Sequence, residues 1–194
     1  MGTGMSEVSE RNERTSVGFW IYLMTDSLLF ASLFATYVVL QPAIANGPSS
    51  ADIFSMPMVL TETIILLISS MTAGLAMLAL RHGFIRQAII FMICTYVAGV
   101  SFLTIELTEF SSLLAEGHSW QTSAFLSGFF TLVGTHGAHI LVGLLWLFVL
   151  VCVLAKRGLT DKLRRQFGLF TLFWHFLDLV WIFIFTVVYL GGVL

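Results

Sequence analysis

The chain has 194 residues, of which 58% are hydrophobic and only 10% are charged, and its formal net charge is -2. This composition excludes an ordinary soluble domain, because a water-exposed surface needs far more charged residues. It predicts a membrane protein. The small net charge says little about partners, so the positions of the charges matter more than their sum.

Five segments are long and apolar enough to cross a hydrocarbon core of about 30 Å. In chain order they cover residues 17–40, 58–80, 87–109, 123–155 and 167–190. The fourth is longer than a perpendicular crossing requires, so we expect it to be tilted. The predicted fold class is all-α, a polytopic bundle of five transmembrane helices within residues 17–194. We expect a disordered cytoplasmic tail over residues 1–16 and turns in the proline-containing loop 41–57.

All nine lysine and arginine residues fall on one side of this five-span arrangement. They precede the first span, separate the second from the third, or separate the fourth from the fifth: Arg11, Arg14, Arg81, Arg86, Lys156, Arg157, Lys162, Arg164 and Arg165. The positive-inside rule makes this side cytoplasmic. The N-terminus is then predicted to be cytoplasmic and the C-terminus periplasmic. A chain with four or six spans would break this segregation.

Ionisable side chains inside the spans are costly, and they mark either a site or a joint between helices. At about 1.5 Å per residue, Asp26, His175 and Asp178 share a level roughly 12 to 17 Å from the cytoplasmic side. A histidine beside a carboxylate can exchange protons near neutral pH, which indicates a proton relay. The aromatic neighbours Trp174 and Trp181 favour the alternative, a hydrogen-bonded joint between helices.

Three glutamates lie toward the outer ends of the second and third spans. Glu62 is near the start of the second span, and Glu106 and Glu109 close the third. Together they can form a carboxylate cluster that loads protons, or they can be solvated helix ends. We expect Glu109 to be solvated. Both interpretations stay open for Glu62 and Glu106, because their depth argues against full solvation and no cation on that side is available to pair with them.

The run GTHGAHILVG at residues 134–143 places His136 and His139 three residues apart on one helical face. Two such histidines can in principle bind a metal ion or haem. However, one helix cannot supply axial ligands to both faces of a porphyrin, and the spans offer only His175 as a further histidine. We therefore favour hydrogen bonds between helices. We expect no catalytic, metal-binding or cofactor-binding residue in this chain.

Several segments resemble subunit III of the haem-copper oxidases. The similar runs are GFWIYLMTDSLLFASLFATY (18–37), TETIILLISSMT (61–72), IELTEF (105–110), GTHGAHILVG (134–143) and WHFLDLVWIFIFTVVYL (174–190). The resemblance covers nearly everything from Val17 onward. The histidine pair of the fourth span together with the Trp-His-Phe-x-Asp run of the fifth is specific, whereas either alone is weak. The resemblance matches Asp26, Glu106, Glu109, His136, His139, His175 and Asp178 to family positions. It does not extend to Glu62.

The opening and closing runs are most similar to the bacterial bo-type ubiquinol oxidase branch. The resemblance implies a multi-pass protein of the bacterial inner membrane, in a complex that passes electrons from quinol to oxygen. Haem and copper would reside in partner subunit I, with subunits II and IV as further partners and no nucleic acid. This chain would carry no catalytic centre. It would pack against subunit I, bind phospholipid in a cleft between helices, and support proton uptake and turnover stability.

Three alternatives remain at this point. Subunit III of a cytochrome c oxidase differs in its electron donor, and usually has seven helices, of which this chain resembles the last five. A stand-alone diheme anchor that oxidises quinol would use His136, His139 and His175, and its absorption spectrum would show a Soret band. A proton-coupled transporter would use the buried carboxylates, but we find no internal repeat of the kind common in such proteins.

Overall fold

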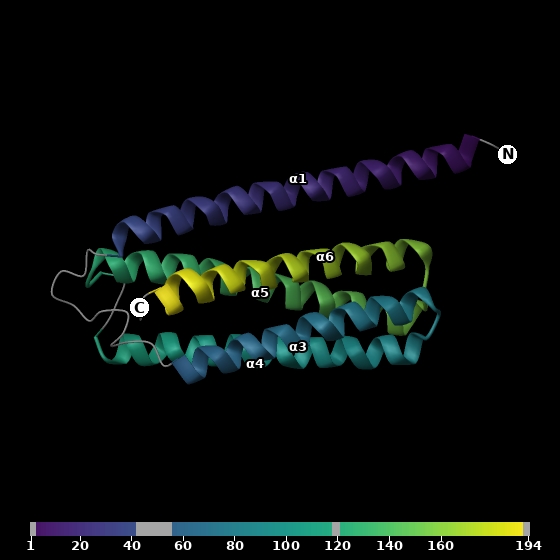
Figure 1. Cartoon of the computed structure of the whole chain (residues 1–194). Coiled ribbons are helices and arrows are strands. Elements are labelled where there is room, and N and C mark those ends of the chain that lie inside the picture. Colours follow the sequence, from purple (N-terminus) through teal and green to yellow (C-terminus); the bar gives the residue numbers. More distant parts are fainter. Residues whose placement is uncertain (1–2, 42–55, 118–120, 192–194) are drawn as a thin grey trace.

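The computed structural model describes residues 3–41, 56–117 and 121–191, with side chains from residue 13 onward. These residues are all-helical, and five of their helices are long and apolar enough to cross a membrane, as the sequence predicts. They are α1 (Thr3–Leu40), α3 (Met56–Arg81), α4 (Ile85–Ala115), α5 (Ala124–Arg157) and α6 (Asp161–Ile184), and a π-helical turn, η1 (Phe185–Leu190), continues α6 (Figure 1). Most of the predicted loop 41–57 lies outside the described residues.

The helices extend past the apolar spans at several ends. The largest difference is in α1, which is helical from Thr3, whereas the sequence predicts a disordered tail over residues 1–16. The sequence there places Glu7 four residues before Arg11 and Glu10 four residues before Arg14, a spacing that favours helical backbone. The apolar, membrane-length part of this helix lies within residues 13–40.

Short turns with glycine in the left-handed region join two pairs of helices. Gly83, with φ +78°, lies in the α3–α4 turn, and Gly158, with φ +70°, follows α5. Thr160 then begins α6, and its hydroxyl accepts a hydrogen bond of 3.2 Å from the Leu163 amide. Such residues stop one helix and start the next within a few positions. The paired helices must therefore run antiparallel.

Helix α3 packs most extensively against α4, and α6 packs against both α3 and α5. Helix α1 lies at one side of this group, contacts α5 more than α6, and is the least buried of the five spans. Figure 1 shows that the N-terminal end of α1 and the α3–α4 and α5–α6 turns lie at the same end of the bundle. The segments that carry the lysines and arginines are therefore gathered at that end.

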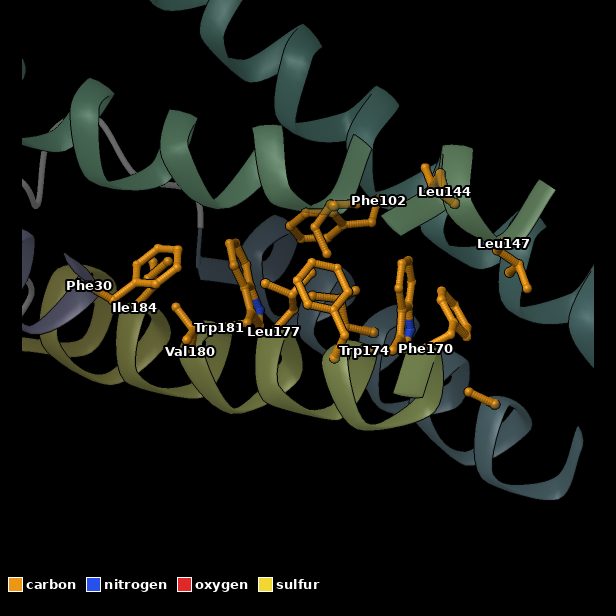
Figure 2. Packing of buried hydrophobic residues seen from close by; sticks show 14 of the residues in the cluster. Phe30, Phe102, Leu144, Leu147, Phe170, Trp174, Leu177, Val180, Trp181 and Ile184 are labelled. Atoms are coloured by element: carbon orange, nitrogen blue, oxygen red, sulfur yellow. The ribbon is translucent and has the colours of Figure 1, made fainter. Parts of the chain in front are cut away.

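The core between the helices is dominated by aromatic side chains from α6. Figure 2 shows Trp174 and Trp181 pointing from α6 toward the helices that carry Phe102 and Leu144. Trp174 fits because two facing residues are glycines. A Cβ atom would lie 3.0 Å from the Trp174 ring at Gly99 and 2.9 Å from it at Gly143. Small residues thus let α4 and α5 approach the indole closely.

Both tryptophans also tie α6 to α3 through hydrogen bonds. The indole N–H of Trp174 donates to the Ser69 hydroxyl at 3.0 Å, and that of Trp181 donates to the Thr63 hydroxyl at 3.1 Å. Burying an indole without a partner for its N–H would leave a polar group unsatisfied. The serine and threonine of α3 therefore position two turns of α6, and with them the polar residues that lie between.

Candidate functional site

The ionisable side chains inside the helices form three separate groups. The first joins α1 to α5, the second lies between α3 and α4 toward the end of the bundle opposite the α3–α4 turn, and the third lies where α6 meets α3. Their members, in that order, are Asp26, His136 and His139; Glu62, Glu106 and Glu109; and His175 and Asp178. The three groups differ in burial and in the partners available to them.

Asp26 of α1 faces His139 of α5. The Asp26 Oδ2 atom lies 3.7 Å from His139 Nε2, and the other ring nitrogen, Nδ1, lies 2.7 Å from the carbonyl oxygen of Thr135. A carbonyl oxygen only accepts, so Nδ1 carries a proton and donates it. Nε2 is therefore the ring nitrogen that faces the carboxyl group of Asp26 across the contact between α1 and α5.

His136 makes no such contact, although it is one helical turn from His139. Its side chain is fully buried, and neither ring nitrogen has a hydrogen-bond partner among the described residues. The ring stacks on Trp181 with centroids 5.3 Å apart and meets Phe102 edge-on at 5.9 Å. His136 is therefore held by aromatic packing, whereas His139 is held by polar contacts.

The three glutamates lie close enough to one another to interact electrostatically. Glu62, Glu106 and Glu109 have 0%, 2% and 9% of their surfaces exposed. The prediction that Glu109 is a solvated helix end is therefore wrong. The prediction assumed that the helix ends where its apolar run ends. Helix α4 instead continues past Glu109 to Ala115, which keeps this carboxyl group inside the bundle.

Neighbouring helices close around this glutamate cluster. Gly137 of α5 faces Glu106, and a Cβ atom there would lie 2.9 Å and 3.0 Å from its two carboxyl oxygens. Tyr189 of η1 is near enough to interact electrostatically with all three glutamates. Neither carboxyl oxygen of Glu62 or Glu106 has a hydrogen-bond partner among the described residues. Buried carboxyl groups without a cation nearby are suited to holding protons.

His175 and Asp178 lie one helical turn apart on α6, and both lie beside α3, but they differ in burial. Asp178 is buried, and its carboxyl group lies beside Ser70 of α3. His175 is exposed, and it packs over Gly74 of α3, where a Cβ atom would lie 3.8 Å from its Nε2. The sequence places Asp26 at the level of these two residues, but the structure pairs Asp26 with His139 instead.

The described side chains offer no group of three His, Cys, Asp or Glu close enough to hold a metal ion. His136 and His139 both pack against Phe30, as their position on one helical face predicts, but of the two only His139 has polar contacts among the described residues. Chemically, the arrangement can hold and exchange protons and can join helices. The Asp26–His139 contact escaped the sequence analysis because depth was counted from the ends of an overlong fourth span.

Nearly the whole chain is similar to known proteins, and the similar proteins are oxidase subunits of one kind. The family model described as cytochrome c oxidase subunit III matches residues 7–193. Cytochrome bo(3) ubiquinol oxidase subunit 3 of Pseudomonas aeruginosa is 54% identical over 180 residues, covering 93% of this chain and 86% of the relative. Cytochrome c oxidase subunit 3 of Bacillus sp. (strain PS3) is 45% identical, with coverages of 91% and 85%. Quinol oxidase subunit 3 of Bacillus subtilis is 43% identical, with coverages of 97% and 92%.

Proposed function

Because the chain belongs to the cytochrome c oxidase subunit III family, the third subunit of the haem-copper oxidases, we propose that it is the non-catalytic subunit III of a quinol-oxidising respiratory terminal oxidase. Members of this family associate with other oxidase subunits and generally have no redox cofactor of their own. In this proposal the main partner is subunit I, which holds the haem and copper, and subunits II and IV complete the complex.

The observation that carries this proposal is the use of the intramembrane polar groups as contacts between helices. Asp26 joins α1 to α5, and the hydroxyls of Ser69 and Thr63 accept hydrogen bonds from the two α6 tryptophans. These contacts stabilise a rigid bundle and are typical of a structural subunit. The role that follows is to support proton uptake and to prolong turnover by holding subunit I in its active arrangement.

Lipid binding belongs to the same proposal. A groove of about 700 Å³ runs between α1 and α6 and is lined almost entirely by apolar side chains, among them Phe30, Ala31, Phe34 and Phe183. Its only polar lining residue, Ser27, donates its hydroxyl to the Leu23 carbonyl of its own helix. Such a groove suits the acyl chain of a phospholipid, which needs no hydrogen bonds. The groove is our candidate for the lipid cleft.

The membrane placement that we propose is the bacterial inner membrane. The positive-inside rule then puts the turn after Arg81, the turn after Arg157 and the N-terminal end of α1 on the cytoplasmic side. The C-terminus and the glutamate cluster face the periplasmic half. This orientation is tested by labelling single cysteines introduced at His82 and Glu116, in a background without Cys94 and Cys152, from each side of sealed vesicles.

The experiment that tests the proposed function is purification of the intact complex in mild detergent by a tag on this chain. We expect haem- and copper-containing subunit I to be recovered in equal amount. The complex should oxidise ubiquinol and not reduced cytochrome c. The second candidate function is subunit III of a cytochrome c oxidase, because the relative from Bacillus sp. (strain PS3) has that name. Such a complex would oxidise reduced cytochrome c and not ubiquinol. Recovery of this chain without any haem-containing polypeptide would contradict both.

A further inference from the structure

A second groove beside α6, with a different set of lining residues from the apolar one, has polar residues in its wall. It has a volume of about 670 Å³ and lies between α3 and α6. His175 and Thr171 line it from α6, and Ser70, Gly74 and Arg81 line it from α3, with leucine and methionine side chains between them. We refer to it as the His175 groove.

His175 differs from the other exposed polar side chains within the spans. The hydroxyls of Thr25, Thr104 and Thr131 each donate to a carbonyl oxygen of their own helix, which satisfies them in a lipid environment. The exposed imidazole of His175 makes no hydrogen bond to any described residue. It lies eight residues after Phe167, about 12 Å along the helix axis from the start of the apolar span. At that depth an acyl chain supplies no hydrogen-bonding group.

We propose that the His175 groove is the surface on which a transmembrane helix of another oxidase subunit docks, with a hydroxyl, amide or carboxyl side chain bonded to His175. The proposal rests on the proposed function, since it assumes that this chain works inside an oxidase complex. Neutral imidazole has one donor and one acceptor, so any of these partner side chains can satisfy it.

The shape of the groove and its position in the chain favour a separate polypeptide. Gly74 leaves open the space under the His175 ring, and small residues of this kind allow a helix backbone to come close. Arg81 closes the cytoplasmic end of the groove, where it can reach a carboxylate or a helix C-terminus. The described C-terminal end of α1 and N-terminal end of α3 lie at the opposite end of the bundle from the α3–α4 turn that follows Arg81.

The first test uses photo-crosslinking in the purified complex. A benzoylphenylalanine replaces Met71, which lines the groove and is 61% exposed, or Val142 of α5, which is 58% exposed and does not line it. We expect the probe at position 71 to form a cross-link with another oxidase polypeptide and the probe at position 142 to react with lipid. Cross-links from position 71 to lipid alone would overturn the docking surface, whatever the probe at position 142 gives.

The second test asks whether His175 itself holds the partner. His175→Ala is expected to release this chain from the complex several-fold faster under detergent challenge, and His175→Gln, which keeps a hydrogen-bonding group, is expected to retain it. Val142→Ala truncates an exposed α5 side chain that lines neither groove and serves as the control. Equal release of His175→Ala and Val142→Ala would contradict the proposal. Failure of the wild-type chain to co-purify with any oxidase subunit would instead contradict the proposed function.

Discussion

Asp26 and His139 join the outermost helix of the bundle to its neighbour, with 3.7 Å between Oδ2 and Nε2. The ring of Phe30, also in α1, packs against His139 at 5.3 Å between centroids. These two contacts with His139 hold α1 beside α5. Since α1 also forms one wall of the apolar groove, the pair maintains the proposed lipid site as well.

The first prediction concerns the strength of this pair. A double-mutant cycle with Asp26→Asn and His139→Gln is expected to give a coupling free energy between about 0.5 and 2 kcal/mol, the range for polar contacts within membrane bundles. It is measured by unfolding titrations in mixed micelles. The control cycle combines His139→Gln with Lys156→Gln, about 25 Å farther along α5, and should be additive. Additivity in both cycles would show that the two side chains do not interact.

The second prediction concerns the glycine that faces the glutamate cluster. Gly137→Ala should destabilise the bundle by about 1–3 kcal/mol, because the new Cβ atom would overlap the carboxyl oxygens of Glu106 in a closely packed site. Gly134→Ala is the matched control, since its nearest atom, in the Phe110 ring, lies 3.7 Å from the added Cβ. The thermal denaturation midpoints of the two variants are compared, and that of Gly137→Ala should be the lower. Equal stability would mean that Glu106 moves away from α5 without cost.

The third prediction concerns the bonds between α6 and α3. Trp181→Phe keeps an aromatic ring in the core but removes the hydrogen-bond donor to Thr63. Loss of this bond should lower the free energy of unfolding by about 0.5–1.5 kcal/mol, and the smaller ring lowers it further by leaving a cavity. Adding Thr63→Val should cost little more, because the bond is already lost. The same unfolding titration measures both variants. If the double variant were less stable than Trp181→Phe by as much as the bond is worth, the Thr63 hydroxyl would stabilise the fold in another way.

The fourth prediction concerns the apolar groove between α1 and α6. Ala31→Trp fills the groove and should reduce the phospholipid that co-purifies with the complex, as measured by mass spectrometry of extracted lipid. Leu28→Trp is the control, because Leu28 is 73% exposed on the same helix and does not line the groove. If Ala31→Trp retained as much bound phospholipid as the control, the groove would not be the lipid site.

The sequence predicts the five membrane-length helices because each contains a long apolar run, although the helices extend past these runs. The spans expected at 58–80 and 87–109 lie within α3 and α4, and the cationic segments lie at one end of the bundle, as their alternation along the chain requires. Long apolar runs are a strong signal, because the membrane imposes both the length and the composition of each crossing.

The rotation of each helix about its axis could not be predicted in the same way. In a soluble helix the apolar stripe shows which side faces the core, but these helices are apolar on all sides. His175 therefore appeared equivalent to Asp178, although one is exposed and the other is buried beside Ser70. The glycines that face Trp174 mark the sides of α4 and α5 that turn toward α6. The sequence alone does not show this, because each glycine lies on a different helix from the indole.

The structural role of the intramembrane polar groups is tested by an oxygen-consumption trace of the purified complex carrying Asp26→Ala. We expect an initial rate of quinol-driven oxygen reduction close to that of the unchanged complex. Activity should then decay several-fold sooner during turnover, because the bundle no longer holds its outermost helix and lipid. A complex with normal assembly and normal lifetime but without initial oxygen reduction would contradict the account, since Asp26 would then take part in the reaction itself.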